Sequence, residues 1–307
     1  MDKKHIYPVV FALDDNYVPY LAVSIQSLID NGSKDNFYKI YAFHTGLSEE
    51  HINMFSVYNT DNSSVEFLNV KPQMDRIRDE VCIRDNYTET IYFRLFIPEL
   101  LSEYKRVLYL DSDISLVSDV AELFNIEMGD NVVAAARDEA VAAVDIFSEY
   151  TIKYLGIKGT DYFNSGVLLI DNENYRKQGI KERSDKMISK FAFEVAPDQD
   201  FLNVLLYGKV QFFDKRWNRM PMPDPNFDDA NLKLIHYNLN FKPWRFSDIL
   251  YGEYFWKYAE KTPFYDVILH AKDEYDDEAK ARDERNLARL MQLCRDYIDS
   301  GKRYDEE

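Results

Sequence analysis

The stretch RVLYLDSDI, residues 106–114, decides the fold class of this 307-residue chain. Its first five residues form a largely apolar run of the kind found in buried β-strands, and Asp111 and Asp113 follow without a spacer. Open α/β sheets bind ligands beyond the carboxyl ends of their strands, and carboxylates are hard oxygen ligands for divalent cations. The stretch therefore predicts a sheet strand that ends in a metal site.

Strand and helix signals alternate on both sides of this stretch. Apolar runs predict further strands at residues 7–13, 37–43, 65–70, 132–135, 166–170, 210–213 and 232–235. Apolar spacing and N-cap residues predict helices after Asn16, from Ser48, and over residues 92–101, 144–155 and 199–206. This order predicts an α/β fold with a single Rossmann-like mixed sheet, largely parallel and flanked by helices.

The last segment of the chain differs in composition. From about Asp276 onward charged residues dominate, and the apolar residues among them have the spacing of one amphipathic helix face: Leu287, Leu290, Met291, Cys294 and Ile298. The tail is net acidic, which favours a helix that caps the domain over one that lies on a membrane surface. We therefore expect one main domain over residues 1–245 and a C-terminal helical extension over residues 246–307 packed on it.

Charge and cysteine content restrict the partners and the compartment. The formal net charge of -17 disfavours nucleic-acid binding, because that binding rests on clustered Lys and Arg. Cys82 and Cys294 are too few for a disulfide framework and favour a reducing compartment, so a cytoplasmic location is expected. The first residues, MDKKH, lack the features of a signal peptide. No apolar stretch approaches the ~20 residues of a membrane span, so any membrane contact is expected to be peripheral.

The common glycine-rich phosphate loops are missing from the sequence. Neither G-x-x-x-x-G-K-[ST] nor G-x-G-x-x-G occurs, so a bound diphosphate would need a metal to neutralise its charge. Two aspartates can hold Mg²⁺ or Mn²⁺, which then bridges phosphate oxygens. By itself Asp-x-Asp is a weak signal, because aspartates often end strands and start turns.

Five separated motifs accompany the two aspartates. They are VFALDDNY at residues 10–17, FNSGVLLI at 163–170, PDQD at 197–200, HY at 236–237 and KPW at 242–244. In this order and spacing the set resembles glycosyltransferase family 8, which includes bacterial lipopolysaccharide galactosyl- and glucosyltransferases and glycogenin. The resemblance covers about residues 6–244. It implies a GT-A fold, a nucleotide-sugar donor and retention of the anomeric configuration.

The resemblance also implies a metal site. In it Asp111, Asp113 and His236 bind Mn²⁺, with Mg²⁺ as the alternative ion, and the metal holds the diphosphate of UDP. Two carboxylates and one imidazole offer both oxygen and nitrogen ligands. Such a mixed set suits Mn²⁺ better than the all-oxygen set of a calcium site would. The alternative for His236 is an ordinary histidine at a strand end.

Further positions match residues of the family that contact the donor. Ala12, Asp14, Asn16 and Tyr17 look like the uridine pocket, and the resemblance implies donor contacts from Arg94, Ser112, Asn164 and Lys242. Lys242 would meet the diphosphate as a point charge. The alternative for residues 14–16 is a helix N-cap cluster, and the alternative for Lys242 is a surface lysine.

The catalytic candidates lie together in PDQD. Asp198 and Gln199 match residues that contact the donor sugar, although the same run also fits a helix start. An amide is a poor nucleophile, so a glutamine at this position argues against a covalent intermediate. It favours attack by the acceptor on the same face of the donor sugar as the leaving phosphate, with Gln199 as electrostatic support. The neighbouring Asp200 leaves a double-displacement route open. Leu239 departs from the family, which commonly has Gly three residues after the histidine, so the path of this loop is in question.

The resulting hypothesis is a Mn²⁺-dependent retaining hexosyltransferase. It would move galactose or glucose from UDP-galactose or UDP-glucose to a glycan or lipid-linked hydroxyl. One alternative is a non-catalytic sugar-nucleotide or glycan-binding protein on a degenerate transferase fold. A haloacid-dehalogenase-like phosphatase is a weaker alternative, since Ile114-Ser115 follows the aspartates where Gly-Thr is expected.

Overall fold

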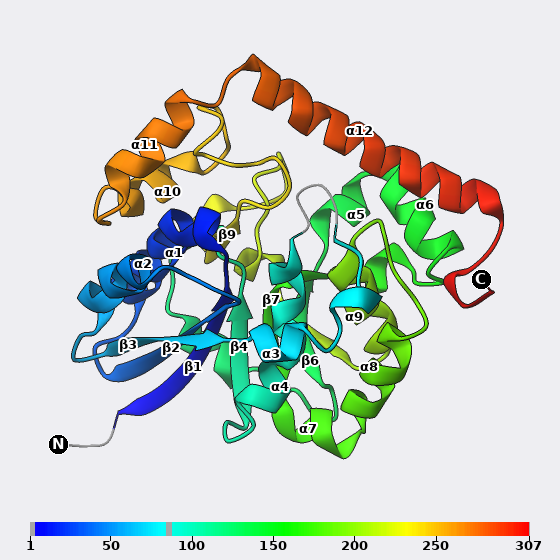
Figure 1. The fold of residues 1–307 in the computed structure, drawn as a ribbon, viewed down its shortest axis with the longest axis horizontal. Helices are drawn as coiled ribbons and strands as arrows, with labels where there is room; N and C mark the ends of the chain where they lie inside the picture. The colour runs from blue at the N-terminus through cyan, green and yellow to red at the C-terminus, as the bar shows by residue number, and fades with distance from the viewer. Residues whose placement is uncertain (1–3, 84–87, 307) are drawn as a thin grey trace.

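A seven-stranded mixed sheet forms the centre of the molecule. The computed structural model describes residues 4–83 and 88–306, and its sheet has the strand order β3-β2-β1-β4-β7-β6-β8 (Figure 1). The bounds are β1 His5–Ala12, β2 Asn36–His44, β3 Ser63–Asn69, β4 Arg106–Leu110, β6 Val133–Arg137, β7 Phe163–Asp171 and β8 Val210–Phe212. Neighbouring strands run parallel except at β7, which is antiparallel to both β4 and β6. The predicted mixed, largely parallel α/β sheet is confirmed.

Both faces of the sheet are buried. Along β1, Val9 and Phe11 join one hydrophobic core, and Val10 joins the core on the opposite face. Successive side chains of a strand point to opposite faces, so a strand covered on both sides reads as a continuous apolar run. This is why β1 and β4 were visible in the sequence.

The chain leaves the sheet at Asp111 and forms a second, two-stranded sheet. Strand β5, Ile114–Leu116, pairs antiparallel with β9, Leu234–His236, and Ile114 lies opposite His236. The N–H of Tyr237 donates to the carbonyl of Asp113 at 2.9 Å. The strand predicted near residues 232–235 therefore exists, but it lies outside the central sheet, and its register brings His236 to the two aspartates.

Helix α1 holds this second sheet in place. It spans Val18–Asn31, starts with a proline in its first turn, and turns two serines toward β5. Ser24 Oγ donates to the carbonyls of Ser112 and Ile114 at 2.9 and 3.0 Å, and the N–H of Leu116 donates to Ser27 Oγ at 2.9 Å. Both serines are fully buried, so their hydroxyls satisfy backbone groups that no strand partner reaches.

Further helices cover the sheet (Figure 1). They are α2 Glu49–Met54, α3 Lys71–Met74, α4 Ile97–Leu100, α5 Glu139–Ala143, α6 Asp145–Lys153, α7 Asn172–Lys177, α8 Ile180–Ile188 and α9 Pro197–Leu205. The helix predicted over 92–101 is a 3₁₀ helix, Glu89–Phe96, followed by α4. The helices predicted over 144–155 and 199–206 correspond to α6 and α9.

The segment after residue 245 is helical and packs on two sides of the molecule. It contains α10 Gly252–Ala259, α11 Tyr265–Asp273 and α12 Asp277–Ser300. Phe255 and Ile268 are buried in the core that contains α1, whereas Cys294 is buried in the core that contains α6. Helix α12 crosses above α5 and α6 in Figure 1. The domain boundary at residue 245 stays a prediction.

The ends of α12 follow the usual capping chemistry. The carboxylate of Asp276 accepts from the N–H of Ala279, and Gly301 ends the helix with φ 68°, a left-handed conformation that glycine adopts at low cost. Among the helices within residues 4–83 and 88–306, none combines the length and apolar composition needed to cross a membrane.

Candidate active site

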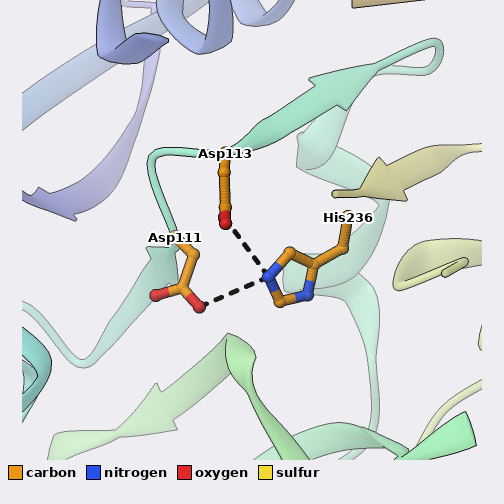
Figure 2. Close-up of side chains that lie close together, drawn as sticks. All are labelled: Asp111, Asp113 and His236. Atoms are coloured by element: carbon orange, nitrogen blue, oxygen red, sulfur yellow. Dashed lines mark ion pairs between the residues drawn. The ribbon is translucent and has the colours of Figure 1, made fainter. Parts of the chain in front are cut away.

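Three potential metal ligands meet beyond the carboxyl end of β4. His236 Nε2 lies 3.4 Å from Asp111 Oδ2 and 3.3 Å from Asp113 Oδ1 (Figure 2). One ligand atom from each of these residues can be chosen so that all lie within 4.8 Å of one another. The aspartates lie in the short link between β4 and β5, and β9 supplies the histidine. The structure thus brings together the three residues that the sequence predicted as ligands.

The donor atoms of this cluster fit a divalent cation. Asp113 Oδ1 and His236 Nε2 are buried and have no hydrogen-bond partner among the described residues. A buried polar atom without a partner costs free energy, and a cation between them would satisfy both. His236 Nδ1 lies 2.8 Å from Asn218 Oδ1, so Nδ1 carries a proton, and Nε2 is the nitrogen that can offer its lone pair to a cation. Two carboxylate oxygens and one imidazole nitrogen form a ligand set that a divalent metal ion can accept.

Neighbouring charges shift the pKa values of all three residues of the cluster. Burial by itself lowers the pKa of His236, but the negative charges of Asp113 and Asp111 raise it to about 9. Without a cation the ring is therefore protonated at neutral pH, and a metal ion bound at Nε2 would displace that proton. Burial also tends to raise the pKa of both aspartates, yet Arg94 beside Asp111 and Lys242 beside Asp113 outweigh it. Both carboxyls therefore stay ionised well below neutral pH, as metal ligands must be.

Gly166 is required by the crowding around the cluster. A Cβ at this position would lie 2.2 Å from His236 Cε1 and 2.6 Å from Asp111 Oδ2. The glycine lies in β7, antiparallel to β4, and its carbonyl accepts from the N–H of Asp111 at 2.8 Å. The backbone of β7 thus packs directly against the cluster, and no space is left for a side chain at position 166.

Two buried cations hold the aspartates. Arg94 donates from Nη2 to Asp111 Oδ1 at 2.9 Å, and its Nε lies 3.3 Å from Asp198 Oδ2. Lys242 Nζ donates to Asp113 Oδ2 and, at 2.6 Å, to the carbonyl of Tyr237. Arg94 and Lys242 are each 5% exposed, so Lys242 is a buried partner of a candidate ligand and not a surface lysine.

A cavity of about 540 Å³ opens above the cluster. Its volume is in the range of small-molecule sites. Most predicted site residues line it: Asp14, Asn16, Tyr17, Arg94, Asp111, Asp113, Asn164, Asp198, Gln199, Asp200, His236 and Lys242. Ala12 and Ser112 lie behind this lining, where Ser112 Oγ donates to the carbonyl of Ala12 at 2.8 Å. Their predicted contacts with a donor stay predictions.

Asp14 is the N-cap of a short 3₁₀ helix, Asp15–Tyr17. Its Oδ1 accepts from the N–H of Asn16 and of Tyr17 at 3.0 and 3.2 Å, as the alternative based on helix capping predicted. This cap turns Tyr17 toward the cavity, where its ring lies edge-on to Tyr20 at 5.5 Å between centroids. Capping and donor binding are compatible, because capping engages only one carboxylate oxygen.

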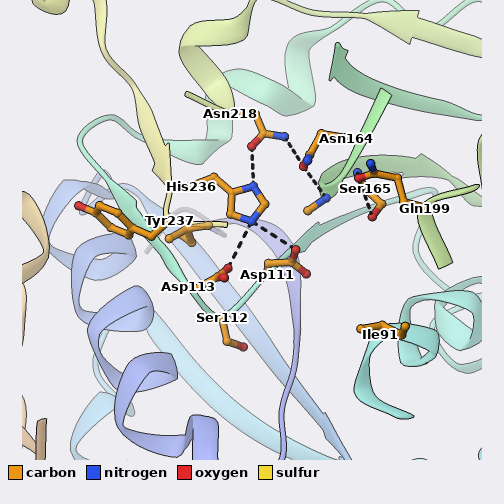
Figure 3. A network of polar contacts seen from close by, with 12 residues as sticks. Ile91, Asp111, Ser112, Asp113, Asn164, Ser165, Gln199, Asn218, His236 and Tyr237 are labelled. Carbon is orange, nitrogen blue, oxygen red and sulfur yellow. Dashed lines mark hydrogen bonds and ion pairs between the residues drawn. The ribbon is translucent and has the colours of Figure 1, made fainter. Parts of the chain in front are cut away.

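A hydrogen-bond network connects the histidine with the predicted catalytic residues. Figure 3 shows its links from His236 to Asn218 and Asn164 and from Ser165 to Gln199. Asn218 Nδ2 donates to Asn164 Oδ1 at 2.9 Å, and Asn164 Nδ2 donates to Asp138 Oδ2 at 2.9 Å. Gln199 Nε2 donates to the same Asp138 oxygen at 3.1 Å, and Gln199 Oε1 accepts from the N–H of Ser165 at 2.9 Å. Each amide is therefore oriented by its neighbours.

Sequence reasoning missed several members of this network. Asp138 follows strand β6 and caps α5, since its Oδ1 accepts from the N–H of Val141 at 2.9 Å. Asp138 is an acidic residue that follows a predicted strand, the same sequence pattern that marked Asp111 as a site candidate. Asn218 lies in a loop outside every motif, so no signal in the sequence marks it. Ser165 and Gly166 lay within a quoted motif without an assigned role.

Asp198 and Asp200 lie in the first turn of α9, which confirms the predicted helix start. Asp198 Oδ2 accepts from Ser165 Oγ at 3.0 Å. The carboxylate of Asp200 accepts from Tyr162 Oη at 2.6 Å, from Tyr150 Oη at 2.9 Å, and from a backbone N–H. Asp200 is fully buried, so three donors hold it inside the wall of the cavity.

Leu239 adopts a glycine-like backbone. Its φ is 49°, in the left-handed region, and its side chain is 39% exposed. A residue with a Cβ costs roughly 1–2 kcal/mol in this conformation. The loop therefore keeps the conformation that glycine favours, and the leucine side chain projects from it.

Asn218→Ala is expected to weaken Mn²⁺ binding about 10- to 100-fold. The substitution removes the acceptor that keeps the proton on His236 Nδ1, and loss of such a partner typically has an effect of this size. Calorimetric titration of the protein with Mn²⁺ measures it. Asn226→Ala, at an exposed position in the same loop region, is the control. Equal Mn²⁺ affinity in Asn218→Ala and in wild type would contradict the role of Asn218.

Asp200 should make stability depend on pH. Burial raises its pKa to about 6 despite the hydrogen bonds that it accepts. Because this value lies above the ordinary 3.8, protonated Asp200 contributes its full share to the free energy of unfolding below pH 3.8. This contribution is lost as the pH rises through 6. Between these limits the free energy of unfolding of wild type, relative to Asp200→Asn, should fall by about 3 kcal/mol.

Urea unfolding of both proteins over the range in which they fold measures this difference. Asp185→Asn removes an exposed carboxylate of α8 that pairs with Lys181 and is the control. A difference between wild type and Asp200→Asn that stays constant with pH would contradict the expected titration.

Comparisons with known proteins define the class. The galactosyltransferase LgtC, solved in complex with donor and acceptor sugar analogs, is 26% identical, and the match has a TM-score of 0.65 and covers 83% of this chain and 96% of that one. The bifunctional glycosyltransferase WbbM matches with a TM-score of 0.76 at 24% identity, over 89% of this chain and 53% of WbbM, a likeness of fold alone. The chain thus spans about half the length of WbbM. Fold and site define a glycosyltransferase with the GT-A fold.

The chain belongs to glycosyl transferase family 8, whose sequence model matches residues 8–248. A putative glycosyltransferase of Haemophilus influenzae is 32% identical over 240 residues, 74% of this chain and 67% of that protein. The lipopolysaccharide 1,2-glucosyltransferase of Escherichia coli K12 is 28% identical over 277 residues, 84% and 79% of the two chains. General stress protein A of Bacillus subtilis is 28% identical over 271 residues, 80% and 89%.

Proposed function

We propose that this glycosyltransferase is a retaining hexosyltransferase that moves galactose or glucose from UDP-galactose or UDP-glucose to a glycan or lipid-linked hydroxyl with Mn²⁺. One observation carries the proposal. Asp113 Oδ1 and His236 Nε2 are buried, have no hydrogen-bond partner within residues 4–83 and 88–306, and face Asp111 at the base of a cavity of about 540 Å³. A metal site at the base of a cavity suits a ligand that carries phosphate and a sugar.

Asp111, Asp113 and His236 would hold the cation, and Mg²⁺ is the alternative ion. Bound there, a divalent cation supplies Lewis-acid stabilisation of the diphosphate leaving group. Asp113 and His236 are buried, so charges at these two residues act strongly. Asn218 keeps the lone pair of His236 Nε2 available, and Gly166 leaves the space that the cluster needs.

The donor would lie along the cavity wall that starts at β1. Tyr17 offers a ring for the uracil base, while Asp14 and Asn16 offer polar groups beside it. Lys242 can contact the diphosphate as a point charge. Arg94 is engaged by Asp111 and Asp198, so we assign it to orienting these carboxylates, in addition to the donor contact that the family resemblance implies.

Same-face attack is the proposed route. Gln199 is held between Ser165 and Asp138 at the cavity wall and contains no nucleophilic atom of sufficient strength. Asp200 is held by two tyrosine hydroxyls and a backbone N–H and is fully buried. We therefore assign Asp200 to positioning the start of α9, and Asp198 and Gln199 to contacts with the donor sugar.

The proposed donor sugars draw on two of the relatives. One is named as a lipopolysaccharide 1,2-glucosyltransferase and one as a galactosyltransferase, and both names concern those proteins. The cytoplasmic location that the cysteine content favours stays a prediction.

A panel of UDP-sugars incubated with the protein and Mn²⁺ tests the proposal. Release of UDP without acceptor is expected from UDP-galactose or UDP-glucose and is expected to stop with a chelator. NMR of the transferred product reports the anomeric configuration. UDP binding that does not depend on Mn²⁺, with no hydrolysis of any UDP-sugar, would overturn the proposal and favour a non-catalytic binding protein.

A further inference from the structure

Helix α12 turns one stripe of side chains toward the candidate active site. The stripe consists of Asp283, Asn286, Leu287 and Leu290, with the i, i+3, i+4, i+7 spacing of one helix face. Asn286, Leu287 and Leu290 line the cavity. The family model ends at residue 248, so this wall of the site comes from a segment outside the family match.

Asp283, at the start of this stripe, is a buried carboxylate that makes an ion pair with the partly exposed Arg245. Its Oδ2 accepts from Arg245 Nη1 at 2.6 Å and from Tyr275 Oη at 2.7 Å, and Asp283 is only 3% exposed. The Arg245 guanidinium also lies over the Tyr275 ring at 5.5 Å. A buried carboxylate is stable only when it is paired and hydrogen-bonded, so these contacts fix both Asp283 and the guanidinium.

Arg245 lies at the boundary between the helix and the cavity. It lines the cavity together with Lys242 and Tyr17, and its backbone N–H donates to the carbonyl of Lys242 at 2.9 Å. A guanidinium carries five N–H donors, so the ion pair with Asp283 leaves it able to contact a ligand. Arg245 is thus a second cation beside the lysine that was matched to the diphosphate.

The partner of Arg245 differs from the partners of the two buried cations of the site. Arg94 pairs with Asp111, and Lys242 pairs with Asp113, both candidate metal ligands. Arg245 pairs with Asp283, which is not part of the Asp111, Asp113 and His236 cluster. Its guanidinium is therefore held by Asp283 of α12 and by Tyr275, two residues outside the candidate metal cluster.

We propose that Arg245 contacts the diphosphate of the nucleotide donor and that Asp283 is its positioning residue. The inference rests on the proposed function. A guanidinium binds phosphate oxygens with planar, paired N–H groups, and Arg245 lies beside Tyr17 and Lys242, at the nucleotide end of the cavity. The C-terminal helical segment thereby completes the donor site.

Binding of UDP and of uridine, each measured by calorimetry with Mn²⁺, tests this proposal in the full chain. Arg245→Gln should weaken UDP binding about tenfold, the size expected for loss of one charge-assisted phosphate contact, and change uridine binding less than about twofold. Asp283→Asn should weaken UDP binding in the wild-type background and add nothing in the Arg245→Gln background. Glu284→Gln, an exposed charge change on the same helix, is the control and should bind UDP as wild type does.

Unchanged UDP affinity in Arg245→Gln would overturn the proposal, and so would an equal loss of UDP and uridine binding in Asp283→Asn. If Asp283→Asn does not fold, Tyr275→Phe, which removes one hydrogen bond to the same oxygen, is measured in its place with the same expectations. Wild-type protein that neither binds UDP nor hydrolyses a UDP-sugar would instead reject the proposed function itself.

Discussion

Asp113→Asn and His236→Ala are each expected to reduce metal-dependent UDP-sugar hydrolysis on the order of 10³-fold. Each substitution removes one of three candidate ligands, and a metal Lewis acid contributes several kcal/mol of charge stabilisation to such reactions. The asparagine keeps the size of Asp113 but loses the charge that pairs with Lys242. Hydrolysis rates as a function of Mn²⁺ concentration measure the effect, with calorimetry of Mn²⁺ binding as an independent measurement.

His270→Ala is the matched control for the histidine variant. His270 lies on α11 with its side chain 73% exposed and pairs with Glu274, so its removal should leave metal binding and hydrolysis unchanged. Wild-type hydrolysis in Asp113→Asn or His236→Ala would refute the assignment of the metal ligands, whatever the result for His270→Ala.

Gly166→Ala is expected to reduce the same activity roughly 10²- to 10³-fold and to weaken Mn²⁺ binding in parallel. The new Cβ would lie 2.2 Å from His236 Cε1 and 2.6 Å from Asp111 Oδ2, distances that nonbonded atoms do not adopt. Two of the three candidate ligands must therefore move. Overpacking of this kind also costs about 1–3 kcal/mol of stability, which thermal unfolding would detect.

Gly46→Ala separates this effect from the general effect of replacing a glycine. A Cβ at Gly46 would meet no atom within 4 Å, so Gly46→Ala should keep wild-type Mn²⁺ binding and hydrolysis. If Gly166→Ala also keeps full activity, then β7 can move away from the cluster, and the metal site does not depend on close contact with this strand.

The strands of the central sheet could be predicted because their burial appears in local sequence. Strands β1 and β4 are covered on both faces, so their residues form apolar runs, and Asp111 ends one such run abruptly. The helix start at PDQD was equally visible, since proline in the first turn and acidic residues near a helix N-terminus favour a helix there. These signals depend only on neighbours in the chain.

The supporting residues of the site could not be predicted in this way. Asn218 lies in a loop, and its importance comes from a contact of 2.8 Å with a histidine 18 residues away. Asp283 lies 38 residues from Arg245 on a charged helix, where an aspartate is ordinarily exposed. The sequence patterns assigned no role to either residue.

The sequence by itself determined the alternating α/β order, the carboxylates at the end of β4 and the motifs that mark family 8. Only the tertiary structure decided that β9 pairs with β5, which brings His236 to Asp111 and Asp113. It also decided that α12 forms a wall of the cavity. The physical reason is that burial and capping leave a local pattern, whereas strand register and ion pairing between distant segments depend on which surfaces meet when the chain folds.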